Sequence, residues 1–413
     1  MIATLLFLFL SWAGSDGMAQ EPAGGKAPAV SKRPPVVLSE QALRLHHQAL
    51  LVDGHNDLPW QIRSRAGGRV EALDIRRPRP RLHTDMERLR AGGIGAQFWS
   101  AFAPVSHPQP VVAFQEQIDL IRRMCAFYPE FELALTAADI RRIRREGKIA
   151  GLIGVEGGHA IGNSLGVLRN LYALGARYMT LTHSANLDWA DSATDEPKLG
   201  GLSPFGEDVV RTMNRLGMLV DISHVSAETM ADVLKVAQAP VIASHSSAFA
   251  LAPHPRNVPD SILAQLPQNG GVIMVNFYTG YLVGEVVQAL EEVKKVRREL
   301  RQRYPEEEEF RAQFAAWRAA NPVESGTVHH VVDHIDHIAK VAGIDHVGLG
   351  SDFDGISQLP RQLQDVSMFP YITQEMLNRG YSETDIGKVL GLNLLRALEQ
   401  AEQVASSLTE AAK

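Results

Sequence analysis

Eight short apolar stretches alternate with segments of helical periodicity along this 413-residue chain, and few folds accommodate that order. Continuous apolar runs of this length are typical of strands covered on both faces, as in parallel sheets. Eight such strands, each followed by a helix, predict an α/β chain that closes into a (β/α)8, TIM-like barrel. Two open sheets are the alternative, but residues 36–280 contain no linker-like stretch. The predicted strands are Leu50–Asp53, Ile94–Ser100, Ile149–Val155, Tyr178–Thr182, Met218–Ser223, Pro240–Ser244, Gly271–Phe277 and His346–Ser351.

A charged insertion follows the seventh predicted strand, at about residues 285–325. Its opposite charges recur at i,i+4, which is typical of exposed helices. A solvated surface is the simplest interpretation; a lid over the site and a homodimer contact are the alternatives. We expect one barrel domain, residues 39–405, with this helical insertion and with further helices at Ser39–Gln48, Met86–Ala91, 111–128, Ala137–Glu146, Leu165–Leu174, Gly206–Leu216, Ala227–Ala237, Pro259–Leu266, Val328–Ala342, and from Thr373 and Thr384.

Side chains that bind metals follow six of the eight predicted strands. In a (β/α)8 barrel the carboxyl ends of the strands surround the active site, so these side chains should converge. A single His or Asp at a strand end is usually a structural polar group, but six such ends indicate a site for divalent metal ions. The residues are His55, Asp57, Glu156, His183, His224, His245 and Asp352.

The number of these side chains exceeds what one four-coordinate zinc ion needs. Two zinc ions sharing a carboxylate would use them, and Glu156 is the natural bridge because its strand lies between the two ligand groups in sequence. His55 and Asp57 would then hold one ion, and His224 and His245 the other. A hydroxide between two metal ions is a strong nucleophile at neutral pH, which predicts a hydrolase.

Three further residues have predicted catalytic or substrate-binding roles. Asp352 exceeds the ligand requirement and could move the proton from the attacking water to the leaving group. His183 could donate to the developing oxyanion or orient the substrate. Arg256 lies in a loop after the sixth strand, where a guanidinium suits a carboxylate; a surface arginine is the plain alternative.

Several other chemistries are disfavoured by what the chain contains. No GxxxxGK or GxGxxG motif is present to bind phosphates. A net charge of −6 argues against a nucleic-acid partner. No lysine ends the third or fourth strand, so a carbamylated-lysine bridge between metal ions is disfavoured. The single cysteine, Cys125, excludes an intrachain disulfide and falls in a predicted helix, where an inert buried thiol is expected.

The amino terminus predicts export. Residues 1–10 form an apolar run that is short for a membrane span, and Gly17–Ala19 offers a small-residue cleavage site before Gln20. We therefore expect a signal peptide at residues 1–19, although no basic residue precedes the apolar run; an uncleaved anchor is the alternative. Residues 20–38 are expected to form a flexible leader. The polar carboxyl terminus lacks the apolar tail of a lipid-anchor signal.

The motifs resemble those of the renal (membrane) dipeptidases, zinc peptidases of the metal-dependent hydrolase barrel class. The resemblance runs from about residue 44 to 398. The motifs that carry it are VDGHNDLP at Val52–Pro59, GVEGGH at Gly154–His159, LTHSAN at Leu181–Asn186, NRLGM at Asn214–Met218, DISHVS at Asp221–Ser226, SHSSA at Ser244–Ala248, RNVPD at Arg256–Asp260 and GSDFDG at Gly350–Gly355.

The resemblance implies a dipeptide substrate whose carboxyl-terminal carboxylate binds Arg256. It also implies tolerance of a D-residue at that position, and two zinc ions on the ligands assigned above. The chain departs from the mammalian pattern because it lacks the disulfide cysteines and the lipid-anchor tail. A bacterial-type exported enzyme, periplasmic or secreted and without a stable membrane span, is therefore expected.

Two alternatives remain open at this stage. A related binuclear barrel hydrolase acting on another amide, a β-lactam or a lactone would keep the metal ligands without needing Arg256. A non-catalytic metal-binding protein would be expected to lose Asp352, which is present.

Overall fold

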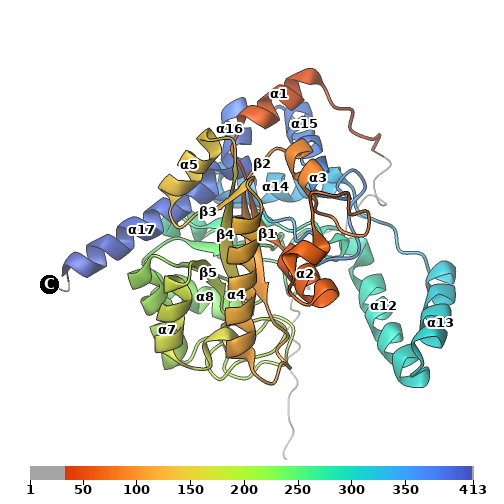
Figure 1. Ribbon diagram of the computed structural model, residues 1–413, viewed down its shortest axis with the longest axis horizontal. Coiled ribbons are helices and arrows are strands. Elements are labelled where there is room, and N and C mark those ends of the chain that lie inside the picture. Colours follow the sequence, from red (N-terminus) through yellow and green to blue (C-terminus); the bar gives the residue numbers. More distant parts are fainter. Residues whose placement is uncertain (1–32, 412–413) are drawn as a thin grey trace, which may run out of the picture.

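A computed structural model describes residues 33–411 (Figure 1). The predicted signal peptide at 1–19 lies outside the described residues, as does the leader up to residue 32. Residues 33–38 contact the barrel: the Gln362 side chain bonds both the N–H of Val36 (2.8 Å) and its carbonyl oxygen (2.7 Å). Within residues 33–411, no helix is both long enough and apolar enough to cross a bilayer.

Eight parallel strands form the closed barrel that the sequence predicts. They pair in the cyclic order β1-β2-β4-β5-β6-β7-β8-β9, and β9 pairs again with β1. The additional strand β3 pairs only with the start of β4 and lies outside this ring. The strands are β1 (Leu51–Asn56), β2 (Ile94–Phe102), β3 (Phe131–Leu133), β4 (Ile149–Glu156), β5 (Ala176–Thr180), β6 (Leu219–Asp221), β7 (Val241–Ala243), β8 (Val272–Val275) and β9 (Val347–Leu349).

The helices surround the barrel largely where they are expected, with four differences, one of which is the short unpredicted helix α11 before the insertion. The sequence reading omits α2, although Asp57 before it, Pro59 in its first turn and Gly67 after it are helix signals. The predicted helix Pro259–Leu266 is two short helices, and the last region holds three. The helices are α1 (Glu40–Gln48), α2 (Leu58–Ala66), α3 (Met86–Ala91), α4 (Pro110–Phe127), α5 (Ala137–Arg145), α6 (Leu165–Ala173), α7 (Pro204–Leu216), α8 (Ala227–Val236), α9 (Asp260–Leu263), α10 (Leu266–Asn269), α11 (Thr279–Leu282), α12 (Gly284–Arg303), α13 (Glu307–Ala320), α14 (Val328–Ala342), α15 (Pro370–Asn378), α16 (Glu383–Gly387) and α17 (Asn393–Ala411).

The two-residue period of β4 directs one of its faces into the barrel. Ala150 and Leu152 belong to the buried cluster that fills the barrel interior and packs against α17. Ile153 and Val155 belong to the larger cluster between the barrel and the outer helices. Continuing the inner face through Gly154 places Glu156 at the carboxyl end of the barrel, pointing inward.

The charged insertion forms two long helices that project from the barrel. Figure 1 shows α12 and α13 side by side, extending away from the body of the molecule. The first turns of α12 are anchored by buried Val286, Val287 and Leu290, whereas most of its later residues are exposed. Arg301 of α12 pairs with Glu307 of α13 at 3.0 Å, which joins the two helices.

Cys125 is buried in α4, as expected for an inert thiol. Burial raises the pKa of this thiol to about 12, so almost none of it is thiolate at neutral pH. A nucleophilic role for Cys125 is therefore excluded by both its place and its chemistry.

Candidate active site and metal centre

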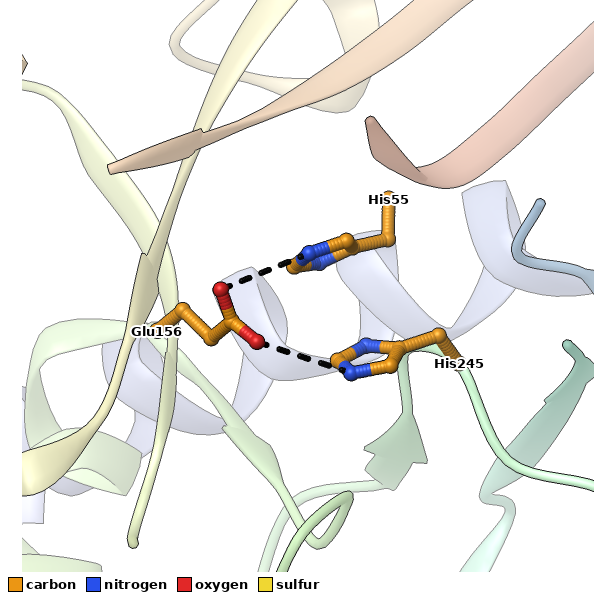
Figure 2. Close-up of side chains that lie close together, drawn as sticks. All are labelled: His55, Glu156 and His245. Carbon is orange, nitrogen blue, oxygen red and sulfur yellow. Dashed lines mark ion pairs between the residues drawn. The ribbon is translucent and has the colours of Figure 1, made fainter. Parts of the chain in front are cut away.

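Glu156 lies at the centre of four imidazole rings at the carboxyl end of the barrel. One of its oxygens, Oε2, lies 3.6 Å from Nε2 of His55, and the other, Oε1, lies 3.7 Å from Nε2 of His245 (Figure 2). Oε1 is also 3.2 Å from Nε2 of His224 and 3.5 Å from Nε2 of His183. Because every ring presents Nε2 to the same carboxylate, the cluster is arranged around the space next to Glu156.

A second group of ligand atoms adjoins the first through His55. Nε2 of His55 lies 3.3 Å from Oδ2 of Asp57, and these two side chains form a compact group with Asp352. Asp57 is the residue before α2, with φ −96° and ψ 19°, so it has left the strand. The two side chains were expected to converge because His55 and Asp57 are two residues apart in an extended segment. They do converge, but Asp57 reaches this position from the turn that leads into α2, not from the strand.

A tyrosine from β5 crosses the barrel to orient His55. The Tyr178 hydroxyl lies 2.9 Å from Nδ1 of His55 and donates to the Gly54 carbonyl at 3.3 Å. With the hydroxyl proton directed to the Gly54 carbonyl, Nδ1–H of His55 donates to the tyrosine oxygen, and Nε2 is the nitrogen left to face a metal ion. Burial lowers the pKa of His55, but Tyr178, Glu156 and Asp57 outweigh burial and hold the pKa well above its usual range, so a metal ion at Nε2 would take the place of a proton. Gly154 makes room for the ring, because a Cβ there would lie 2.0 Å from Cζ of Tyr178.

A serine and an aspartate orient His245 in the same way. The Ser244 hydroxyl donates to Oδ2 of Asp221 at 2.6 Å, so it can only accept from Nδ1–H of His245 at 2.8 Å. The lone pair of His245 is therefore on Nε2, which faces Glu156. Hydrogen bonds that fix the tautomer of a histidine in this way are typical of metal ligands.

The donor atoms fit divalent metal ions. Nε2 of His55 is buried and has no hydrogen-bond partner among residues 33–411, although a buried polar atom normally has one. Nε2 of His224 lies 2.9 Å from Nε2 of His245, a hydrogen-bond distance, so both nitrogens face the same point and a cation bound by both would replace this contact. Neutral imidazoles with carboxylates are the ligands that zinc prefers. Among residues 33–411, three groups of such atoms are compact enough to hold an ion, and all three belong to this cluster.

The environment shifts the pKa values of these groups in opposite directions. Burial raises the pKa of Glu156, but the adjacent imidazoles outweigh burial and hold the pKa well below its usual range. Burial is also the main cause that lowers the pKa of His224 and His245, which favours the neutral, metal-binding form. Burial, together with the charges of Asp57 and Glu156, raises the pKa of Asp352 to about 8.

Three residues that line the site have left-handed backbone conformations, which residues other than glycine rarely adopt. His224 has φ 67°, Asp352 has φ 62° and Asp354 has φ 66°. Such conformations cost energy and persist where the surroundings fix them, often at functional sites. Asn276, which follows β8, donates from Nδ2 to Oδ2 of Asp352 at 2.9 Å and so fixes the carboxylate.

Arg256 lies in the wall of the site and is only 1% exposed. Its guanidinium donates through NH1 to Oγ of Ser246 (3.1 Å) and through NH2 to the carbonyl of His245 (3.2 Å). Its Nε has no partner within the part of the chain that the structure describes. The guanidinium also lies 5.4 Å from the centre of the Tyr281 ring. Arg256 is thus an anchored cation with unused donors, and the surface-arginine alternative is wrong.

A cavity of about 450 Å³ opens over the metal-type ligands. Its volume falls within the range of small-molecule sites. Seven of the eight residues that the sequence singled out line it, and His55 lies beneath them, fully buried. The lining residues are Asp57, Trp60, Gln61, Phe102, Glu156, His183, His224, His245, Arg256, Tyr278, Tyr281, Lys294, Asp352, Asp354, Gly355, Ile356 and Ser357.

Several supporting residues were missed by the sequence analysis. Tyr178, Asn276 and Tyr281 carry no motif that would single them out. Asp53 and Asp221 could have been found, because each is a charged residue inside an otherwise apolar strand. Asp53 is fully buried, and its carboxylate accepts hydrogen bonds from the backbone N–H (2.7 Å) and the hydroxyl (2.6 Å) of Ser351.

A closed (β/α)8 barrel with imidazoles and carboxylates gathered at the carboxyl ends of its strands is the architecture of a metal-dependent hydrolase. Residues 39–412 match the membrane dipeptidases, peptidase family M19. The chain therefore belongs to this family, as its motifs predict, and it is a metal-dependent dipeptidase.

Individual relatives agree with this assignment. The chain is 39% identical over 384 residues to dipeptidase verJ of Clonostachys rogersoniana, covering 90% of this chain and 89% of the relative. It is 41% identical over 374 residues to dipeptidase 3 of Mus musculus, covering 89% and 67%. The crystal structure of the probable dipeptidase PvdM from Pseudomonas aeruginosa matches with a TM-score of 0.76 at 27% identity, covering 88% of this chain and 98% of that one.

Gly355 provides space that the two aspartates need. A Cβ at this position would lie 2.2 Å from Oδ2 of Asp57 and 2.5 Å from Oδ1 of Asp352. Gly355→Ala is expected to displace both carboxylates and to lower kcat/KM about a hundredfold, since shifts of 1 Å in a catalytic group have effects of that order. Gly387→Ala, where the nearest atom is 3.7 Å away, is the control. Full activity of Gly355→Ala in a steady-state dipeptide assay would contradict this account.

Proposed function

We propose that the protein hydrolyses dipeptides with two zinc ions. His55 and Asp57 would hold one ion, His224 and His245 the other, and Glu156 would contribute one oxygen to each. The observation that carries this proposal is the convergence of the Nε2 atoms on Glu156, together with the unpartnered Nε2 of His55. Two bound divalent ions supply an activated water and polarise the carbonyl of the scissile bond.

His183 faces the substrate cavity in this proposal. Its side chain is 21% exposed, whereas His55 and His245 are almost fully buried. The His183 ring stacks on the His224 ring with centres 4.3 Å apart, which fixes its orientation. From this position Nε2–H of His183 would donate to the oxygen that gains negative charge when the peptide carbonyl is attacked.

Asp352 would move the proton from the attacking water to the departing amine. The Asn276 amide holds one of its oxygens, Oδ2, and the other, Oδ1, lies on the side of Asp57 and Gly355. A carboxylate that is held through one oxygen and has its other oxygen on the side of the metal ligands suits this transfer.

Arg256 would bind the carboxyl-terminal carboxylate of the dipeptide. Two of its donors anchor it to Ser246 and to the His245 backbone, and the remaining donors are available to a ligand. A fixed cation at a fixed distance from the metal ligands selects short peptides. Tolerance of a D-residue at the carboxyl-terminal position is part of the proposal and rests on the family resemblance alone.

The test is hydrolysis of a dipeptide library by chelator-treated protein before and after zinc is restored. We expect about two zinc ions per chain in the active protein, from metal analysis, and loss of activity when they are removed. A stoichiometry of one ion in fully active protein would contradict the bridging role of Glu156. Undiminished hydrolysis after complete chelation would overturn the zinc-dependent mechanism.

We also propose that the protein is exported and that the mature chain begins near Gln20. The support is the composition of residues 1–19, which lie outside the described part of the structure. Amino-terminal sequencing of protein from the periplasmic or secreted fraction should begin near Gln20. A chain there that still starts at Met1 would favour an uncleaved anchor.

A further inference from the structure

The insertion contributes a lysine to the wall of the active-site cavity. Lys294 lies in α12 and lines the cavity together with Arg256 and the metal-type ligands. Part of the charged insertion is therefore a wall of the substrate site and not only a solvated surface. Among the described residues that line the cavity, two are Lys or Arg, namely Arg256 and Lys294.

Contacts through His254 place Lys294 on the Arg256 side of the cavity. Nδ1 of His254 accepts from the backbone N–H of Arg256 at 3.1 Å, and its ring lies 4.7 Å from that of Tyr281. On its other edge, Nε2 of His254 lies 3.4 Å from Oε1 of Glu291. The same Glu291 oxygen accepts from Nζ of Lys294 at 2.7 Å. Arg256 and Lys294 are thus linked through one buried histidine and one glutamate.

A second hollow, of about 620 Å³, adjoins the active site, and Lys294 lines both. It also contains Arg297, Arg298 and Arg301, with Glu307 as its one carboxylate among the described lining residues. Arg301 is paired with Glu307, but Arg297 and Arg298 form no ion pair within residues 33–411. This local excess of positive charge, on a chain with net charge −6, would attract anions toward the cavity.

We propose that Lys294 recognises an acidic side chain on the carboxyl-terminal residue of the dipeptide. This inference rests on the proposed function, because Arg256 must hold that residue's main-chain carboxylate. The two cations would then bind the two carboxylates of one carboxyl-terminal Asp or Glu. The contact between Lys294 and Glu291 is not an obstacle, because both side chains are about half exposed and a surface pair of this kind contributes little. An ammonium has three donors and can bind both partners at once.

The test compares Ala-Glu with Ala-Gln, which have similar shapes and differ in one charge. The zinc-loaded wild-type enzyme is expected to prefer Ala-Glu by about two- to fivefold in kcat/KM, the size of a half-exposed ion pair. The preference should appear mainly in KM, because the side chain does not take part in bond cleavage. It should shrink as ionic strength rises from about 20 to about 200 mM, since exposed charges are screened.

Lys294→Met, which keeps an unbranched apolar stem, should abolish this preference, with a loss of kcat/KM on Ala-Glu that exceeds any loss on Ala-Gln. Lys295→Met is the matched control, because Lys295 pairs with Glu292 at 3.6 Å and does not line the cavity. Equal kcat/KM for the two dipeptides in the wild type would overturn the inference. So would equal losses on both substrates in Lys294→Met, or loss of the preference in Lys295→Met. Failure of the zinc-loaded wild type to cleave Ala-Gln at all would instead count against the proposed function.

Discussion

Glu156→Gln is expected to lose bound metal and to lower kcat/KM by roughly a hundredfold to several thousandfold, the range for removing one partner of a buried charged cluster. The carboxylate lies within 3.7 Å of the Nε2 atom of four histidines, and it is 5% exposed. An amide keeps the shape but removes the negative charge and one of the two acceptor oxygens. Both proposed ion positions would weaken together because both share this side chain.

The measurement pairs metal analysis with steady-state kinetics on the same preparations. Ser100→Ala is the graded comparison, because its hydroxyl donates to Oε2 of Glu156 at 3.0 Å and its removal leaves the carboxylate in place. Ser100→Ala should show a smaller loss, of about ten- to a hundredfold in metal affinity, as for other supporting residues. If Glu156→Gln retained two ions and activity within tenfold of the wild type, Glu156 would not be the shared ligand.

The barrel and its ligand cluster could be predicted because both follow from short sequence patterns. Apolar runs indicate strands that are buried on both faces. The polar residue that follows each run then lies at the carboxyl end of the barrel. His224 and His245 illustrate this, since each directly follows the strand that the sequence predicts and their Nε2 atoms lie 2.9 Å apart. No knowledge of side-chain packing is needed for that step.

The supporting residues could not be predicted in this way because their roles depend on distance across the barrel. Tyr178 reaches His55 only because Gly154 leaves space between them, and neither residue is near His55 in sequence. The sequence predicts that the insertion containing Lys294 is a solvated helical surface. Opposite charges at i,i+4 predict an exposed helix, but they do not indicate which part of the barrel that helix will face. Strand β3 was missed because it has three residues and only Phe131 among them is buried.

Arg256→Lys is expected to lower kcat/KM on dipeptides roughly thirtyfold to a thousandfold if Arg256 binds the substrate carboxylate. This corresponds to a loss of about 2–4 kcal/mol of transition-state stabilisation. Lysine keeps the positive charge but loses the planar group that donates two parallel hydrogen bonds. It also cannot maintain the contacts to Ser246 and to the His245 carbonyl while facing the cavity. The substrates are a dipeptide, its carboxyl-terminal amide and a tripeptide. The wild type should cleave the first and largely refuse the other two.

Ser246→Ala separates substrate binding from anchoring of the guanidinium. This variant removes the partner of NH1 and keeps the planar donors, so it should retain the preference for the free acid over the amide. Arg256→Lys should lose most of that preference, because the discrimination depends on the guanidinium itself. Thermal unfolding of both variants shows whether the barrel is intact, since Arg256 is buried. Equal wild-type rates on the free acid and the amide would remove carboxylate recognition by Arg256 and leave the selection of dipeptides to some other part of the cavity.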